Sequence, residues 1–341
     1  MKRLCKMAWL AIAMLLLLPA HAGSLGHGLR TERHEFTVVL LDGVSGNAVN
    51  CTMVGYLYYV GTLNNRTLQV AVHGATYSHA YWDFPSVGGE DYSYARYMAN
   101  RGYAVLAIDQ VGAGESCMPD GLTMVQLQNT TNALVQILMG LRSGANPTGI
   151  AFERIALVGH SAGSINAIAA KAATGSQLVD ALVVTGSRHL AVDPLPPGIQ
   201  AVLPLVPLLA SLPYFTLDAA TRTFLFYDTA NADAAVIAAD NASSEAWTGG
   251  QVGTTFAAFV YPYLGLPPFH GVNAVTGPVL IQLGENDALF PAFRHEDERA
   301  FWTSTQPEIQ VLPDMGHDFN LHLTREASWR GIDSWLRQTL H

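Results

Sequence analysis

The chain carries the sequence RIALVGHSAG at residues 154–163, and this stretch decides how the rest of the sequence is interpreted. The apolar residues 155–158 are typical of a buried strand, and the alanine-rich residues 162–173 are typical of a helix. The Gly-x-Ser-x-Gly turn between them has the small residues that let strand and helix approach each other closely. Such a turn lifts the Ser161 hydroxyl above a sheet at a helix N-terminus, so we expect Ser161 to be a nucleophile. An ordinary glycine-rich connection is the alternative.

A serine hydroxyl needs a general base, and the end of the chain supplies one. His317 follows the apolar stretch at residues 309–312, which places it in a turn at the C-terminal end of the last expected strand. His322 is the nearest rival, but it falls within the expected final helix. His295 lies in a charged stretch, and His160 adjoins the nucleophile but points elsewhere on the turn. His317 is therefore the expected base.

The acid that orients this histidine is expected in the loop after the penultimate strand, at residues 279–283. Asp287 occupies the position in that loop where such an acid belongs, and Glu285 competes with it. Asp314 and Asp318 are too close to the histidine in sequence to present a carboxylate at the right angle. The resulting Ser…Asp…His order differs from the orders of chymotrypsin-type and subtilisin-type enzymes.

Acyl transfer also requires backbone donors aimed at the developing oxyanion. The N–H group of Ala162, directly after the nucleophile, is one expected donor. The loop after the strand at residues 68–72 reads HGATY, and Ala75 is its expected donor, with a simple strand-end turn as the alternative. His73 and His79 lie in or near this loop, but no third ligand accompanies them at a usable spacing, so no metal site is expected.

Strand-like and helix-like segments alternate along most of the chain, which predicts an α/β fold with a mostly parallel sheet covered by helices on both faces. The expected strands are residues 36–41, 53–59, 68–72, 103–108, 155–158, 181–185, 279–283 and 309–312. The expected helices are residues 92–100, 124–141, 162–173 and 319–340, with a further helix starting at Phe290. Residues 188–273 contain no clear strand, several prolines and aromatic residues, and an apolar run at 201–212. We interpret them as a helical cap inserted into the sheet domain.

The chain resembles the α/β-hydrolase superfamily over nearly all of the length that follows residue 22. Four motifs carry the resemblance: HGA at residues 73–75, DQVGAGES at 109–116, GHSAG at 159–163, and Asp287 with Gly316-His317. It is similar to secreted bacterial serine hydrolases of the esterase or lipase kind that carry HGATY and YWDFP, here at residues 73–77 and 81–85. The resemblance implies an eight-stranded sheet with an antiparallel second strand, a cap after the sixth strand and a structural role for the 109–116 turn. No cofactor is expected.

Residues 1–22 have the features of a secretory signal peptide, with cleavage expected after Ala22. Lys2, Arg3 and Lys6 precede an apolar run at residues 7–18, and small residues in an Ala-x-Ala pattern follow it. An uncleaved anchor is the alternative, although this run is short for a membrane span. The protein is thus expected to be secreted or periplasmic, without a membrane span after cleavage. Its expected core is residues 23–187 and 274–341, and its expected cap is residues 188–273.

Charge and cysteine content restrict the partners and the compartment. Loss of the three positive charges in residues 1–22 would change the formal net charge from −9 to about −12, which argues against nucleic acid as a partner. Two cysteines remain, Cys51 and Cys117, which suggest one disulfide in an oxidising compartment, with two free thiols as the alternative. The resemblance makes the second and fourth strands antiparallel neighbours, and it therefore implies a Cys51–Cys117 disulfide.

Together these features predict hydrolysis of a carboxylic ester through an acyl-enzyme on Ser161. The apolar cap suggests a hydrophobic small-molecule or lipid-like ester, and Tyr77, Tyr81 and His189 are expected to line its pocket. An amide or peptide hydrolase of the aminopeptidase kind, a lactonase and a carbon–carbon hydrolase are alternative enzymes. A non-catalytic binding protein of the same fold is the alternative outside enzymes. The sequence leaves the oligomeric state open.

Overall fold

The computed structural model describes residues 28–189, 194–263 and 270–340. The expected signal peptide, residues 1–22, lies outside the described residues. Within the described ranges, no helix combines the length and the apolar character that a bilayer crossing requires.

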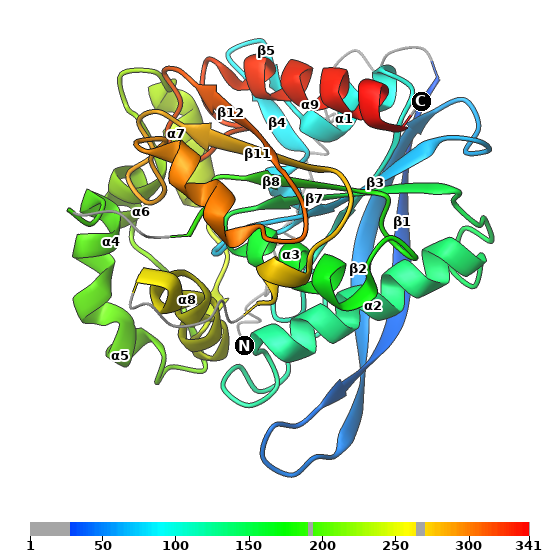
Figure 1. The fold of residues 1–341 in the computed structure, drawn as a ribbon, viewed down its shortest axis with the longest axis horizontal. Coiled ribbons are helices and arrows are strands. Elements are labelled where there is room, and N and C mark those ends of the chain that lie inside the picture. Colours follow the sequence, from blue (N-terminus) through cyan, green and yellow to red (C-terminus); the bar gives the residue numbers. More distant parts are fainter. Residues whose placement is uncertain (1–27, 190–193, 264–269, 341) are drawn as a thin grey trace, which may run out of the picture.

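An eight-stranded sheet forms the centre of the molecule (Figure 1), with the strand order β1-β2-β6-β3-β7-β8-β11-β12. The strands are β1 (Leu29–Leu41), β2 (Ala48–Val60), β3 (Thr67–Val72), β6 (Ala104–Ile108), β7 (Arg154–His160), β8 (Ala181–Thr185), β11 (Val279–Gly284) and β12 (Glu308–Leu312). β2 pairs antiparallel with β1 and β6, whereas the pairs from β6 to β12 are parallel. This arrangement confirms the fold class and the antiparallel second strand that the resemblance implies.

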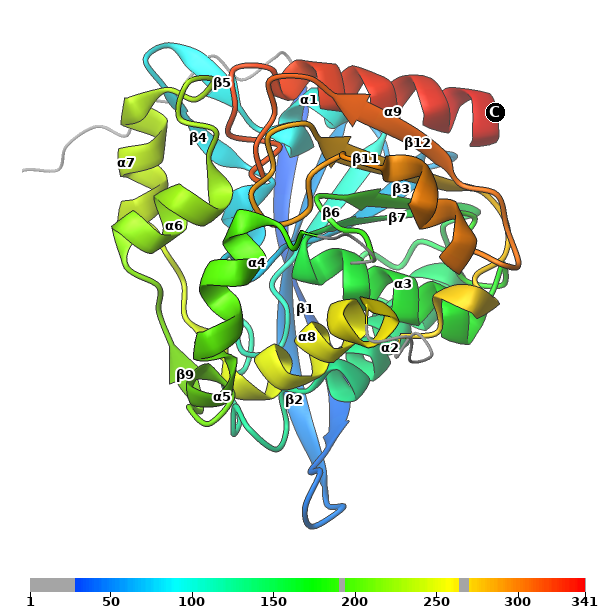
Figure 2. The same ribbon diagram turned by 60° about the vertical axis from the view of Figure 1, so that its left-hand side comes forward.

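Helices cover both faces of this sheet (Figures 1 and 2). α1 (Tyr94–Asn100) and α9 (Arg325–Leu340) pack on one face, and α2 (Leu127–Ser143) and α3 (Ala162–Thr174) pack on the other. Each pair of helices buries apolar side chains in its own core cluster against the sheet. The central strands are apolar on both sides, so their burial requires such a cover on each face.

Between β8 and β11, the sixth and seventh strands of the sheet, the chain forms a helical cap beside the sheet domain (Figure 2). Its helices are α4 (Pro197–Val202), α5 (Val206–Leu209), α6 (Ala219–Phe226), α7 (Ala234–Ala242) and α8 (Gly249–Tyr263). Asp218 and Asp233 precede α6 and α7, and their carboxylates accept hydrogen bonds from the N–H groups of Thr221 and Ala235. These N-terminal caps explain where both helices begin.

The structure differs from the sequence-based expectations in several local elements. The final helix begins at Arg325 and not at Phe319, and the segment after Phe290 forms a 3₁₀ helix at His295–Phe301. A short hairpin, β4 (Phe84–Val87) with β5 (Glu90–Tyr92), was not expected. The cap also contains two paired strands of two residues each, β9 (Tyr214–Phe215) and β10 (Trp247–Thr248). Strands this short carry too few residues to show an alternating pattern.

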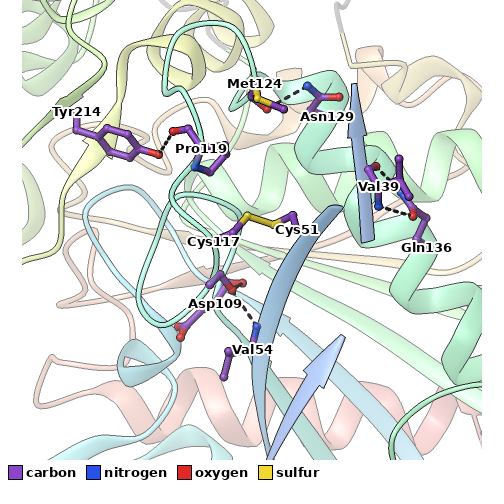
Figure 3. The surroundings of a disulfide bond; sticks show 11 residues. Val39, Cys51, Val54, Asp109, Cys117, Pro119, Met124, Asn129, Gln136 and Tyr214 are labelled. Atoms are coloured by element: carbon purple, nitrogen blue, oxygen red, sulfur yellow. Dashed lines mark hydrogen bonds between the residues drawn. A yellow bond between two sulfur atoms is a disulfide. The ribbon is translucent and has the colours of Figure 1, made fainter. Parts of the chain in front are cut away.

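The expected disulfide joins Cys51 on β2 to Cys117 in the loop after β6 (Figure 3). This loop also holds the DQVGAGES turn, in which the Asp109 carboxylate accepts hydrogen bonds from the N–H groups of Glu115 and His79. A Cβ atom at Gly114 would lie 2.3 Å from the Asp109 carboxyl carbon, so the turn admits only glycine there. These contacts support the structural role expected for this turn.

Candidate active site

Ser161 lies at a sharp turn between β7 and α3, in backbone geometry that few residues adopt. Its φ of 52° and ψ of −122° lie outside the regions that residues with side chains favour. A Cβ atom at Gly159 would approach the Ser164 Cα atom to 2.5 Å, and one at Gly163 would approach the Val72 carbonyl oxygen to 2.3 Å. Both positions therefore require glycine, which is the physical reason for the Gly-x-Ser-x-Gly pattern at this turn.

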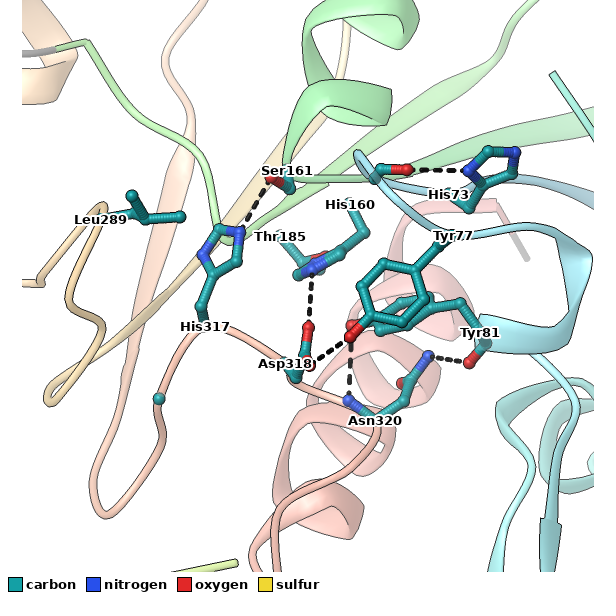
Figure 4. Close-up of polar contacts among 12 residues, drawn as sticks. His73, Tyr77, Tyr81, His160, Ser161, Thr185, Leu289, His317, Asp318 and Asn320 are labelled. Atoms are coloured by element: carbon teal, nitrogen blue, oxygen red, sulfur yellow. Dashed lines mark hydrogen bonds and ion pairs between the residues drawn. The ribbon is translucent and has the colours of Figure 1, made fainter. Parts of the chain in front are cut away.

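The structure brings Ser161, His317 and Asp287 together from three separate strand ends. The Ser161 hydroxyl lies 2.8 Å from His317 Nε2 (Figure 4). His317 Nδ1 lies 2.9 Å from Asp287 Oδ2. The other Asp287 oxygen accepts hydrogen bonds from the N–H groups of Leu289 and Phe290, at 2.8 Å and 2.9 Å. With three hydrogen-bond donors around it, this buried carboxyl group is held in one orientation.

The position of His317 determines its proton affinity. Burial disfavours the charged imidazolium and lowers the pKa, but the charge and hydrogen bond of Asp287, with a smaller effect of Asp318, outweigh burial, so the pKa of His317 is raised above 6.5. A histidine in this setting can accept a proton from a serine hydroxyl, and the adjacent carboxylate would stabilise the resulting cation.

The rival residues have other partners. His322 Nε2 accepts hydrogen bonds from the N–H groups of Asp228 and Gly316, at 3.1 Å and 3.2 Å, and the ring is buried. His160 is also buried, with Nδ1 3.1 Å from the Thr185 hydroxyl. Glu285 is exposed to solvent. None of these three contacts Ser161 through the hydrogen bonds found among the described residues.

The two residues expected to donate backbone N–H groups to an oxyanion lie at the pocket that contains Ser161. Ala75 and Ala162 line the same pocket as Ser161, and neither N–H group donates to a partner within the described part of the chain. The buried His73 ring accepts a hydrogen bond from Gln110 N–H through Nε2, so its Nδ1 donates to the Gly74 carbonyl oxygen, at 2.8 Å. The Gly74 carbonyl and the Ala75 N–H point in opposite directions from one peptide, so this contact fixes the direction of the Ala75 donor.

An apolar cavity of about 100 Å³ opens beside Ser161. Most of its wall comes from the cap, including Val202, Leu209, Phe215, Leu217, Phe226 and Trp247. No charged side chain of the described residues lines it. The apolar run at residues 201–212 was the sequence signal for this wall, although the individual lining residues were not identified from it.

Tyr77, Tyr81 and His189, which were expected to line the pocket, are not among its lining residues. The Tyr77 hydroxyl lies within hydrogen-bond distance of the buried carboxyl groups of Asp240 and Asp318, and Tyr81 stacks on His160 with ring centroids 4.5 Å apart. His189 Nδ1 lies 2.7 Å from the buried Glu298 carboxylate. All three side chains are buried and engaged elsewhere, so the structure gives them no contact with the pocket.

The histidines considered for a metal site also have protein partners. His79 Nδ1 lies 2.9 Å from Asp109, and the His73 ring is held by Gly74 and Gln110. Within the ranges that the structure describes, no three or more His, Cys, Asp or Glu side chains are grouped so that they could hold a metal ion.

Comparison with known proteins places these features in context. A sequence profile described as "Alpha/beta hydrolase family" matches residues 69–327, and no curated protein sequence matches the chain significantly. A soluble variant of monoglyceride lipase from Saccharomyces cerevisiae, solved with a substrate analogue, is 17% identical with a TM-score of 0.64, and the match covers 89% of this chain and 95% of that one. An esterase from Thermogutta terrifontis is 16% identical with a TM-score of 0.57, over 90% of this chain and 100% of that one. At these identities the similarity is one of fold.

Proposed function

The chain belongs to the alpha/beta hydrolase family, and within that family we propose that it is a serine hydrolase that cleaves carboxylic esters. The observation that carries the proposal is the hydrogen bond between Ser161 and His317 at the wall of an apolar, uncharged cavity. Residues 188–273 would act as the cap over a core of residues 23–187 and 274–341.

The proposed mechanism assigns a role to each group at the site. Ser161 attacks the ester carbonyl while His317 takes its proton, and His317 then gives that proton to the leaving alcohol. Asp287 keeps His317 in the tautomer that accepts from serine. The N–H groups of Ala75 and Ala162 stabilise the oxyanion, and water then releases the acid from Ser161 by the same steps.

The lining of the cavity favours a hydrophobic acyl or alcohol group in the substrate. Apolar substrate surface buried against the cap residues would stabilise binding by roughly 25 cal/mol per Å². A charged group would lose its hydration there without gaining a partner. This lining also disfavours the aminopeptidase alternative, because an α-amino group needs a carboxylate and none of the described residues provides one at the pocket. The esterase and monoglyceride lipase among the similar folds agree with this proposal.

A panel of model substrates tests the proposal. Nitrophenyl esters of increasing chain length would be compared with aminoacyl anilides, using purified protein and the Ser161→Ala variant. We expect ester turnover that increases with chain length and is lost in the variant. Anilide turnover without ester turnover would favour the peptidase, and equal activity of the variant and the wild type would overturn the serine mechanism.

We also propose that the protein is exported. The N-terminal 22 residues have the pattern of a signal peptide, and the Cys51–Cys117 disulfide suits an oxidising compartment. Detection of the processed chain, beginning at Gly23, in the periplasm or the medium would support export. Retention of the full-length chain in the cytoplasm with free thiols would contradict it.

A further inference from the structure

A cluster of four buried polar side chains lies between the cap and the sheet domain, and one of its members is next to His317 in the chain. The Tyr77 hydroxyl lies 2.9 Å from Asp240 Oδ2 and 2.5 Å from Asp318 Oδ2. Arg222 pairs with Asp240 at 2.7 Å. All four side chains are buried, and two of them, Arg222 on α6 and Asp240 on α7, come from the cap. We refer to these four residues as the cap cluster.

The cap cluster contacts the loop that carries the proposed oxyanion donor. Arg222 donates hydrogen bonds to the hydroxyl and carbonyl oxygens of Thr76, which follows Ala75. Thr76 has a φ of 63°, which is strained for a β-branched residue and must be held by its surroundings. Arg222 is the buried partner that holds this side chain.

The same cluster contacts the loop that carries His317. Asp318 is the next residue, and the N–H groups of His317 and Asp318 both donate to the carbonyl oxygen of Phe226 at the end of α6, at 3.0 Å and 2.9 Å. Figure 4 shows Asp318 reaching from this loop towards Tyr77 and His160. The cap therefore joins the two loops that must keep a fixed geometry during acyl transfer.

A count of protons assigns the state of Asp318. Tyr77 has one hydroxyl proton but lies within hydrogen-bond distance of two carboxyl groups, so one of these must itself carry a proton. The Arg222 cation contacts the Asp240 carboxyl group at 2.7 Å and makes no ion pair with Asp318. The proton is therefore on Asp318, which donates to Tyr77, while Tyr77 donates to Asp240.

The surroundings of Asp318 agree with this assignment. Its Oδ1 atom lies 3.9 Å from His160 Nε2, too far for a hydrogen bond, and has no partner among the described residues. Asp287, on the other side of His317, has three donors. Burial and then the charge of Asp240 raise the pKa of Asp318 to about 7, against the opposing effects of His317, Tyr77 and Arg222. The titratable or charged groups that face it are Tyr77, Tyr81, His160, Arg222, Tyr227, Asp240, His317 and His322.

We propose that Asp318 is a positioning residue that acts in its protonated form. It links the loop that carries His317 to Tyr77, and through Tyr77 to the cap residues Asp240 and Arg222, which hold the loop of Ala75 and Thr76. Loss of this proton leaves two carboxylates around one hydroxyl, and their repulsion loosens the link between cap and core. The positioning role rests on the proposed ester hydrolysis. The protonation does not, so it is measured separately.

The pH dependence of stability follows from this protonation. A buried carboxyl with a raised pKa keeps its proton in the folded chain while the unfolded chain loses it, so stability falls as the pH rises. The fall begins near the ordinary aspartate pKa of about 4 and ends near about 7, above which both states are ionised. Asp318→Asn keeps a neutral donor to Tyr77 and should lack this component.

The test compares Asp318→Asn, Asp318→Ala and Tyr77→Phe with wild type. Asp314→Asn is the matched control, since Asp314 is exposed on the same loop and asparagine tolerates its φ of 53°. Thermal unfolding midpoints would be measured from pH 4 to pH 9, in the Ser161→Ala background so that the result is independent of activity. The kcat and KM for a nitrophenyl ester would be measured at pH 6 and pH 8.5 in the active background.

We expect the wild-type midpoint to fall relative to Asp318→Asn between about pH 4 and pH 7, with Asp314→Asn following wild type. At pH 6 we expect the kcat of Asp318→Asn to be about tenfold higher than that of Asp318→Ala or Tyr77→Phe. Each of these two variants loses about one hydrogen bond that Asp318→Asn keeps. At pH 8.5 the kcat of Asp318→Asn should gain on that of wild type. A constant difference in midpoint at all pH values overturns the protonation. Equal losses of kcat in the Asn and Ala variants at pH 6 overturn the positioning role.

Discussion

Replacement of Asp287 by asparagine tests the orientation of His317 more sharply than removal of the side chain. One Asp287 oxygen accepts from two backbone N–H groups, and the other accepts from His317 Nδ1. An asparagine has only one oxygen, and the two backbone donors retain it. Its NH₂ group then faces His317 Nδ1, which must become an acceptor. The ring proton moves to Nε2 and points at Ser161, where a proton acceptor is required.

The expected loss follows from this reversal. The wrong tautomer removes general-base catalysis but leaves the oxyanion donors and the pocket intact, so we expect kcat to fall by about 10⁴-fold, as in serine proteases with the same change. This corresponds to roughly 5.5 kcal/mol of transition-state stabilisation. KM should change little, because Asp287 does not line the pocket. The pKa of His317 should fall, since the charge that raises it is gone.

The assay is steady-state hydrolysis of a nitrophenyl ester by the purified Asp287→Asn variant. Glu285→Gln is the matched control, because Glu285 lies on the same loop but its side chain is exposed and makes no hydrogen bond to His317. An Asp287→Asn variant within tenfold of the wild-type kcat would refute the reasoning. A comparable loss in Glu285→Gln would show that the loop and not the tautomer was damaged.

Three further predictions concern the site and the fold. Because His317 must be neutral to act as a base, kcat/KM should rise with pH through an apparent pKa above 6.5. A pH profile with its midpoint below 6.5 would contradict the effect of Asp287. Gly163→Ala places a Cβ atom 2.3 Å from backbone oxygens, so the free energy of unfolding measured with denaturant should fall by about 3 kcal/mol or more. An unchanged denaturant midpoint would contradict the geometry of this turn. The double change Cys51→Ala and Cys117→Ala opens a loop of 66 residues and should lower unfolding stability by about 2–4 kcal/mol, whereas reducing agent should have no effect on that variant.

The sequence was sufficient to predict the elements and residues that depend on short-range patterns. The Ser161 turn is decided by adjacent glycines, and Asp287 and His317 each lie in the loop that follows an apolar strand. Because parallel strands end at the same edge of a sheet, their loops meet there without any further information. The sheet and the residues that the structure brings to Ser161 were predictable for this reason.

The cap cluster and the individual residues of the pocket wall were not predictable, because their partners are far apart in the chain. Tyr77 and Asp318 are separated by 241 positions, and no local pattern marks either as the partner of the other. Asp318 was considered only as a rival for the triad acid, and Tyr77 only as a pocket residue. Their actual contacts depend on how the cap packs on the sheet domain, which is set by tertiary structure.

The central claim is that Ser161 is the nucleophile, and covalent labelling tests it most directly. The purified protein would be treated with an alkyl nitrophenyl phosphonate, which leaves a stable adduct on an activated serine, and the adduct would be located by peptide mass spectrometry. We predict one adduct on Ser161, formed in step with loss of ester hydrolysis and absent from Asp287→Asn on the same time scale. Loss of activity with the adduct on another residue, or continued hydrolysis with Ser161 fully labelled, would contradict the account.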